Sequence, residues 1–181
     1  MPAAKTRKLF VLAALAATVA MTGCVSVPQA KRPADINEYA AAVVWKRDDF
    51  KKRMEFSSFD EGANTPDTLF MRAYKFDDPK VPSIYQIYVA DYYVDEWRFY
   101  TSANDINGNR MDFVQIARDV GSCGSYTGCS KTEHLALNVT REYLEAHVAS
   151  GIKFQVSGRA GSEVFSIPGV AIAGFLKVIP K

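Results

Sequence analysis

The sequence predicts a mainly β fold of the α+β kind, an antiparallel β-sandwich or a strongly curved sheet of about eight strands with short helices near 141–149 and 169–178. Apolar and polar residues alternate with a period of two in most segments after Met54, as they do in half-buried strands. The dipeptide Asn107-Gly108 lies between two such segments and favours a tight hairpin. Helix-capping residues precede only short apolar stripes, so few and short helices are expected.

The first expected element is a helix within Ala34–Lys52, part of which could instead be coil. Asp35 can cap this helix, and Glu38 follows three residues later as in a capping box. The alanines and valines that come next favour a helix or a buried run. Charges at 46–53 could form a lipid-headgroup patch, but their mixed signs favour a solvated helix face.

Two strands are expected next, at Met54–Ser58 and Thr68–Phe76, with a loop at Gly62–Pro66 between them. The segment Ile84–Tyr100 follows and contains seven aromatic residues. As a single strand it would be about 56 Å long, which is too long for a small domain, so a turn among Asp91 to Glu96 should divide it. These aromatic side chains could form a stacking surface for sugars or peptides. In most sheets, however, Tyr and Trp fill the core or pair across strands.

The turn at Asn107-Gly108 is expected to join a strand at 97–103 to a strand at 110–118. The same loop has four oxygen-bearing side chains that could suggest a calcium site, namely Asp105, Asn107, Asn109 and Asp112. An EF-hand loop needs glycine at its sixth position and an acidic residue at its twelfth, and counting from Asp105 these positions hold Arg110 and Ile116. The sequence therefore predicts no metal ion and no cofactor.

Alternation continues through the last third of the chain. In the strand predicted at Lys131–Val139, the inward residues are Leu135, Leu137 and Val139, and the outward residues are Thr132, His134 and Asn138. Thr140 can cap a short helix that ends before Gly151. A hairpin with arms at 152–157 and 163–167 follows, and Pro168 begins a final apolar helix that should dock on the sheet.

The segment Met21-Thr22-Gly23-Cys24 closes an export signal. Three basic residues precede Leu9–Ala20, a run of 12 apolar or small residues that is too short to span a membrane as a helix, which takes about 20. This pattern fits a secretory signal peptide. The four residues before and at the cysteine resemble the lipobox of bacterial lipoproteins, with Met21 where leucine is usual.

The resemblance to lipoproteins implies cleavage before Cys24, a diacylglycerol group on its sulfur and acylation of the new amino terminus. Residues 1–23 would then be the signal peptide, 24–33 a tether and 34–181 a single periplasmic domain. Val25 stands where Asp would favour the inner membrane, so the implied location is the outer membrane, facing the periplasm. A plain secreted protein and an uncleaved membrane helix are the alternatives.

Cys123 and Cys129 remain after Cys24 is assigned to lipid, and three glycines nearby let the chain fold back between them. In an oxidising compartment this pair predicts a structural disulfide. A redox pair is the alternative, but its usual spacer is two residues rather than five. The chain carries a charge of +2, of which the signal peptide contributes three positive charges, so the mature chain is at −1 and lacks the basic footprint of nucleic-acid binding.

A search for catalytic residues finds none. The zinc-binding His-Glu-x-x-His helix, the Gly-x-Ser-x-Gly elbow and the phosphate-binding glycine loop are all missing from the sequence. The two histidines, His134 and His147, are interpreted as an exposed strand residue and a half-buried helix residue.

The sequence therefore predicts a non-enzymatic, membrane-anchored envelope lipoprotein that binds a protein or peptidoglycan through a sheet edge or an aromatic face. A small periplasmic enzyme with an unrecognised site is the alternative. A second alternative is a hydrolase inhibitor that presents the loop Gly124–Gly128, with Tyr126 as the contact residue. The segment Cys123–Lys181 resembles small uncharacterised envelope lipoproteins of proteobacteria, and this resemblance implies no activity.

Overall fold

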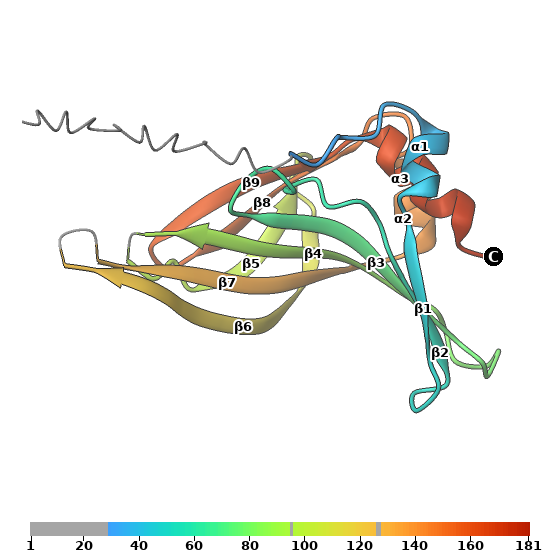
Figure 1. Ribbon diagram of the computed structural model, residues 1–181, viewed down its shortest axis with the longest axis horizontal. Helices are drawn as coiled ribbons and strands as arrows, with labels where there is room; N and C mark the ends of the chain where they lie inside the picture. Colours follow the sequence, from blue (N-terminus) through green and yellow to red (C-terminus); the bar gives the residue numbers. More distant parts are fainter. Residues whose placement is uncertain (1–28, 95, 126–127) are drawn as a thin grey trace, which may run out of the picture.

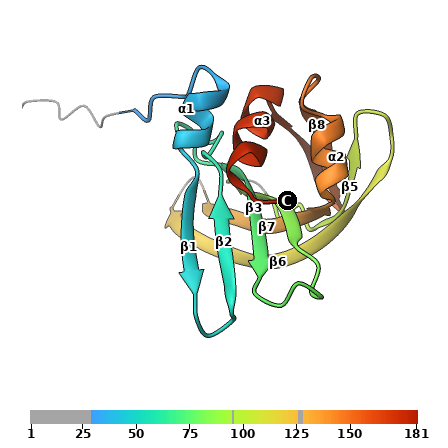
Figure 2. The same ribbon diagram turned by 90° about the vertical axis from the view of Figure 1, so that its right-hand side faces the viewer.

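The computed structural model describes residues 29–94, 96–125 and 128–181, in which one antiparallel sheet curves around three short helices (Figures 1 and 2). The strands in these residues are β1 (Val44–Asp48), β2 (Arg53–Ser57), β3 (Thr68–Phe76), β4 (Ile84–Tyr93), β5 (Tyr100–Asp105), β6 (Arg110–Gly124), β7 (Gly128–Val139), β8 (Ile152–Gly158) and β9 (Gly161–Ile167). The helices are α1 (Ile36–Ala41), α2 (Arg141–Ala146) and α3 (Gly169–Val178). The predicted fold class is confirmed, as a curved sheet rather than a sandwich and with one more strand than expected.

The strand order across the sheet is β1-β2-β3-β4-β7-β6-β5-β8-β9. Ladders of many residue pairs join the first six of these strands to one another, and similar ladders join β5, β8 and β9. Only two residue pairs, Ala103 with Met111 and Asn104 with Arg110, connect β5 to β6. The sheet bends at this narrow junction, and its two parts stand on either side of α3 (Figure 2).

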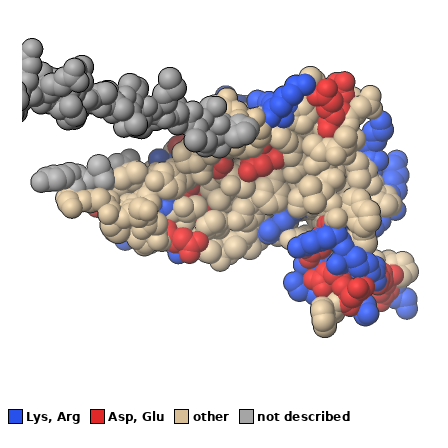
Figure 3. Space-filling view, in the orientation of Figure 1, with Lys and Arg blue, Asp and Glu red and all other residues tan. Residues whose placement is uncertain are grey.

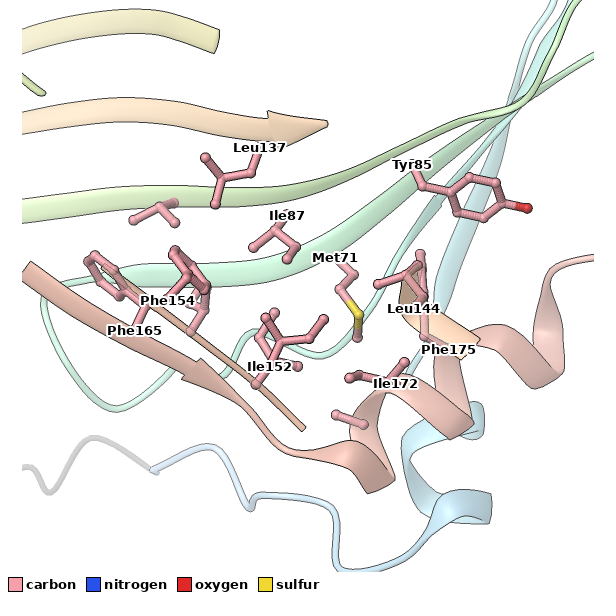
Figure 4. Packing of buried hydrophobic residues seen from close by; sticks show 14 of the residues in the cluster. Met71, Tyr85, Ile87, Leu137, Leu144, Ile152, Phe154, Phe165, Ile172 and Phe175 are labelled. Carbon is pink, nitrogen blue, oxygen red and sulfur yellow. The ribbon is translucent and has the colours of Figure 1, made fainter. Parts of the chain in front are cut away.

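The inner face of the sheet and the helices enclose the hydrophobic core. Side chains from the two parts of the sheet and from α2 and α3 meet there in Figure 4, among them Met71, Ile87, Leu137, Leu144, Phe154, Phe165 and Phe175. Every second residue of a strand faces the same side, which explains why alternation in the sequence predicted this arrangement. Leu135 and Leu137 are buried, and the strand containing them follows the predicted alternation.

Helix α3 lies close to α1 because glycine stands where the two helices meet, at position 174. A Cβ atom at Gly174 would lie 2.5 Å from the Cβ of Tyr39 and 2.9 Å from the backbone nitrogen of Ala40. Glycine is therefore needed where the two helices cross. The predicted boundaries of α3 are confirmed, whereas α2 ends three residues before the predicted 149, with Thr140 accepting a hydrogen bond from the backbone N–H of Tyr143 as its cap.

The helix predicted within Ala34–Lys52 is confirmed at Ile36–Ala41 and is wrong beyond Ala41. Asp35 does cap α1, since its carboxylate accepts hydrogen bonds from the backbone N–H groups of Asn37 and Glu38. The chain then turns into β1, which pairs with β2 along its whole length. Valine and tryptophan at the start of β1 favour a strand, and pairing with β2 outweighs the local helix preference.

The β1–β2 hairpin projects from the body of the molecule and carries charges of both signs (Figure 3). Glu55 pairs with Lys46 and Arg53, and Arg47 pairs with Asp77. The charges at 46–53 therefore form a solvated surface of paired ions, as predicted, although they lie on a hairpin rather than on a helix.

The aromatic segment Ile84–Tyr100 is divided as predicted, but later than expected. Strand β4 runs to Tyr93 and β5 begins at Tyr100. The hairpin at Asn107-Gly108 is present, with Gly108 at a φ of 83°, and it joins β5 to β6. Strand β6 continues to Gly124, six residues beyond its predicted end, because it pairs with β7 along a long two-stranded arm.

The described part of the predicted tether lies against the domain. The side-chain amide of Asn64 donates a 2.9 Å hydrogen bond to the carbonyl of Ala30. Arg32 pairs with the carboxylate of Glu61, whose side chain is only 3% exposed. The signal peptide and Cys24 lie outside the described residues.

Candidate functional site

The outer, convex face of the sheet bears a row of half-buried aromatic and polar side chains. All three helices lie on the opposite, concave side (Figure 2). In β3 the residues Leu69, Met71 and Ala73 are buried in the core, so Phe70, Arg72 and Tyr74 between them face outward. In the strand register, Tyr88 of β4 lies beside Phe70, and Gln86 of β4 lies beside Arg72. Asn138 of β7 lies on the other side of Gln86. We call these six residues (Phe70, Arg72, Tyr74, Gln86, Tyr88 and Asn138) the convex platform.

Rings and cations alternate along the platform. The ring centroids of Phe70 and Tyr88 are 4.9 Å apart. The guanidinium carbon of Arg72 lies 5.0 Å from the ring centroid of Tyr88 and 5.7 Å from that of Tyr74. On the far side of Tyr74, Arg53 lies 4.0 Å from the same ring. Cations within about 6 Å of a ring face are attracted to it, so these contacts hold the rings and Arg72 in fixed positions.

A chain of hydrogen bonds crosses four adjacent strands beside the rings. Arg72 Nε donates to Gln86 Oε1 at 2.8 Å, and Gln86 Nε2 donates to Asn138 Oδ1 at 2.7 Å. Asn138 Nδ2 then donates to Asp112 Oδ2 at 2.8 Å. With neighbouring strands about 4.8 Å apart, the line from Arg72 to Asp112 is about 14 Å long.

His134 lies on the same outer face, as predicted, and connects Tyr88 to Asp119. Its Nδ1 is 2.7 Å from the Tyr88 hydroxyl, and its Nε2 is 2.9 Å from Asp119 Oδ2. Burial raises the pKa of Tyr88, with Arg72 opposing and Asp119 adding to the shift. The hydroxyl therefore stays protonated near neutral pH, which suits a positioned hydrogen-bonding ring rather than a nucleophile.

Two carboxylates lie side by side on the inner face, at the end of the sheet away from the helices. Asp91 and Glu133 are directly opposite each other on β4 and β7, and they are 3% and 0% exposed. The four donors to Glu133 are the Tyr93 hydroxyl (2.6 Å), the backbone N–H groups of Phe99 (2.8 Å) and Tyr100 (3.1 Å), and Arg118 Nε (2.9 Å). Each oxygen of Glu133 thus accepts two hydrogen bonds from the chain itself.

The pKa values of these two carboxylates move in opposite directions. Burial works against the charged form of Glu133, but hydrogen bonds from Tyr93 and Arg118 outweigh it and lower the pKa of Glu133. Burial raises the pKa of Asp91, and its contacts with Tyr100 and Arg98 offset this only in part. Such divergence is a mark of acid–base pairs. Because Glu133 has no lone-pair position left for a substrate, we assign this pair a structural role.

The same cluster joins the two parts of the sheet. Arg98 Nη1 lies 2.9 Å from Asp91 Oδ2 on β4 and 3.1 Å from Glu163 Oε2 on β9. Phe99 has a φ of 50°, an unfavourable conformation for a bulky side chain, and its backbone N–H is held by Glu133. The cluster therefore joins the two parts of the sheet at a second place, in addition to the narrow junction between β5 and β6.

Two cavities flank Tyr143 beside the β5–β6 turn, with volumes of about 440 Å³ and 340 Å³. Asp105 lines both cavities, but its carboxylate accepts hydrogen bonds from the backbone N–H groups of Asn107 and Asn109 and from the Asn109 side chain. These bonds close the turn, which explains the oxygen-rich loop. Among the described residues, no group of three or more His, Cys, Asp or Glu side chains could hold a metal ion.

The cysteine pair lies at the end of the long β6–β7 arm. Cys123 and Cys129 face each other across the two strands and form the predicted disulfide. The last residues of the arm, from Asp119 onward on β6, are exposed. Tyr126, the contact residue predicted for this loop, lies outside the described residues, as does Cys24.

Sequence reasoning did not single out the platform residues as a group. Alternation in Thr68–Phe76 places Phe70, Arg72 and Tyr74 on one face, and that signal was available. The side-chain partners Gln86, Asn138 and Asp112 come from strands whose order across the sheet the sequence did not reveal.

No known protein family, curated protein or solved structure matches the chain. Within the described ranges, no helix combines the length and apolar character needed to cross a membrane. The function must therefore be inferred from the geometry of the protein itself.

Proposed function

We propose that the protein is a non-enzymatic lipoprotein of the cell envelope that binds peptidoglycan through the convex platform. The observation that carries this proposal is the line of ring faces beside a line of hydrogen-bonding side chains on the sheet face away from the helices. A sugar ring has an apolar C–H face and a rim of hydroxyl groups. Aromatic rings stack on the C–H face, and amide and guanidinium groups form hydrogen bonds with the hydroxyl groups.

A linear polymer also suits the shape of the platform. The side chains follow one direction across β3, β4, β7 and β6, on a surface that curves outward. A protein partner is the second candidate, because the exposed and disulfide-linked end of the β6–β7 arm could enter a hydrolase as an inhibitor does. The platform is therefore the proposed binding site, and the end of the β6–β7 arm is the alternative.

In this proposal Cys24 carries the lipid and the domain faces the periplasm from the outer membrane. Four residues, 25–28, lie between Cys24 and the first described residue, and the five residue steps from Cys24 to residue 29 can span at most about 18 Å. Since Ala30 and Arg32 are fixed to the loop that contains Glu61 and Asn64, the domain would be held close to the membrane.

Cys24→Ala should leave the protein folded and release it from the membrane. Each buried lipid CH₂ contributes about 0.8 kcal/mol of membrane affinity, and the core begins well beyond the anchor. Fractionation of cells grown with a labelled fatty acid measures this: the wild type should carry label in the membrane fraction, and the variant should be unlabelled and soluble. A variant that stays in the membrane would contradict the anchor.

Tyr88→Ala combined with Phe70→Ala should weaken binding to isolated peptidoglycan sacculi by about tenfold or more. Each lost stacking contact is worth about 0.5–1.5 kcal/mol, and 1.4 kcal/mol corresponds to a factor of ten. Co-sedimentation of the mature protein with sacculi measures the affinity, and circular dichroism checks folding. Trp45→Ala is the matched control, because Trp45 is 60% exposed on β1 outside the platform.

Two outcomes would contradict wall binding through the platform. One is a wild type that fails to co-sediment with sacculi. The other is equal binding by the wild type and the double variant. If a photo-crosslinker placed at Tyr88 in living cells captures one protein rather than glycan strands, the protein partner replaces the wall.

A further inference from the structure

Arg72 occupies the centre of the convex platform, and within the described part of the chain its terminal nitrogens make no hydrogen bond or ion pair. We infer that its guanidinium binds a carboxylate of the peptidoglycan peptides and thereby selects where on the polymer the protein sits. This inference rests on the proposed wall-binding function and names the chemical group that the platform recognises.

The environment of Arg72 differs from that of the other half-buried arginines. Among the described residues four arginines are half-buried, and three of them pair with carboxylates: Arg53 with Glu55, Arg98 with Asp91 and Arg141 with Glu145. Arg72 has no carboxylate within ion-pairing distance in the described chain. A partly buried charge without a counter-ion is unfavourable, so an incoming carboxylate would meet an unsatisfied cation.

The side chain of Arg72 is also held in place for such a contact. Gln86 fixes its Nε at 2.8 Å, and the rings of Tyr74 and Tyr88 lie on either side of the guanidinium. The two terminal nitrogens therefore remain for a bidentate contact with two carboxylate oxygens, for which the planar guanidinium is well suited. A fixed side chain loses little freedom on binding, which favours affinity.

The charges around the platform favour a ligand with an isolated carboxylate over a polyanion. Asp112 stands at the other end of the hydrogen-bond chain, about 14 Å from Arg72 by strand spacing. Asp119 contacts His134 on the same face. A second negative group on the ligand would approach one of these acids and be repelled. In peptidoglycan, the carboxylates of the peptides are separated by amide bonds and by the sugars of the glycan. A single carboxylate of this kind suits Arg72, which lies between aromatic rings and amide side chains.

The test compares sacculi before and after their carboxylates are converted to amides with carbodiimide and ammonia. Wild-type protein should bind the amidated sacculi about ten- to a hundredfold more weakly than native sacculi, as expected for losing a charge-assisted contact. Arg72→Gln should bind both preparations equally and weakly. Arg72→Lys should recover only part of the preference, since lysine lacks the fork of two donors.

Arg47→Gln is the matched control, because it removes the same charge at an arginine of β1 that lies outside the platform and is already paired with Asp77. It should keep the wild-type preference for native sacculi. Circular dichroism and a thermal melt check that each variant is folded.

The outcomes separate the two proposals. If wild type binds native and amidated sacculi equally, the role of Arg72 is wrong and wall binding stands. If wild type binds neither, the proposed function is wrong. Equal losses in Arg72→Gln and Arg47→Gln would show a general charge effect and overturn the assignment. Stronger binding to vesicles of anionic phospholipid than to sacculi would identify a phosphate ligand and overturn it as well.

Discussion

Replacing Glu133 with alanine should lower the free energy of unfolding by about 3–5 kcal/mol, a large part of the 5–15 kcal/mol typical of a domain. The carboxylate is fully buried and accepts four hydrogen bonds. Its removal would leave Arg118 without its carboxylate and the N–H groups of Phe99 and Tyr100 without their acceptor. Urea denaturation of wild type and variant, followed by circular dichroism, measures the difference.

Replacing Glu133 with glutamine tests how the stability provided by the charged carboxylate depends on pH. Glutamine fills the same space but does not titrate. Because the pKa of Glu133 in the folded protein lies below its ordinary value of 4.5, the carboxylate stabilises the fold above that pH. This contribution disappears as the pH falls through the folded-state pKa. The gap in stability between wild type and Glu133→Gln should therefore be widest at neutral pH and shrink in acid.

Glu145→Ala is the control for the Glu133 variants. Glu145 pairs with Arg141 on the surface of α2, where its side chain is 45% exposed, so its loss should change stability by no more than about 0.5 kcal/mol. A Glu133→Ala loss as small as that of Glu145→Ala would mean that the buried cluster does not join the two parts of the sheet.

The position of Glu133 also shows which part of the site could be predicted from the sequence. Alternation along β7 correctly placed Leu135 and Leu137 inward and His134 outward. The same alternation puts Glu133 inward, where a charged residue needs partners. Those partners, Tyr93 and Arg118, lie 40 and 15 residues away in the chain, and only the fold brings them together.

The error within Ala34–Lys52 has a different cause. Capping by Asp35 was correctly predicted because a cap depends on residues that are neighbours in the chain. Strand β1 depends on its register with β2, in which Trp45 faces Phe56 and Arg47 faces Met54. Such pairing can outweigh the helix preference of a short segment, and a single sequence does not reveal it.

The convex platform could not be predicted without knowing the order of the strands in the sheet. Gln86 and Asn138 are 52 residues apart and become neighbours because β7, rather than the next strand in sequence, pairs with β4. The sequence predicted most of the strands and their faces. The line of hydrogen bonds from Arg72 to Asp112, however, depends on the pairing of β7 with β4.

Phe175→Ala should lower the free energy of unfolding by about 3–5 kcal/mol, the usual cost of truncating a buried phenylalanine. The side chain is fully buried at the centre of α3, within the cluster that also contains Met71 and Leu144 (Figure 4). Close packing of α3 against α1 at Gly174 limits how far the helix can move to fill the space left behind. Urea denaturation measures the loss.

Two variants on the same helix make this result specific to packing. Phe175→Leu keeps most of the apolar volume, so it should be clearly less destabilising than Phe175→Ala. Lys177→Ala changes an exposed residue, so it should alter stability by no more than about 0.5 kcal/mol. If Phe175→Ala costs no more than Lys177→Ala, α3 does not fill the concave face of the sheet, and the core must be closed by other residues.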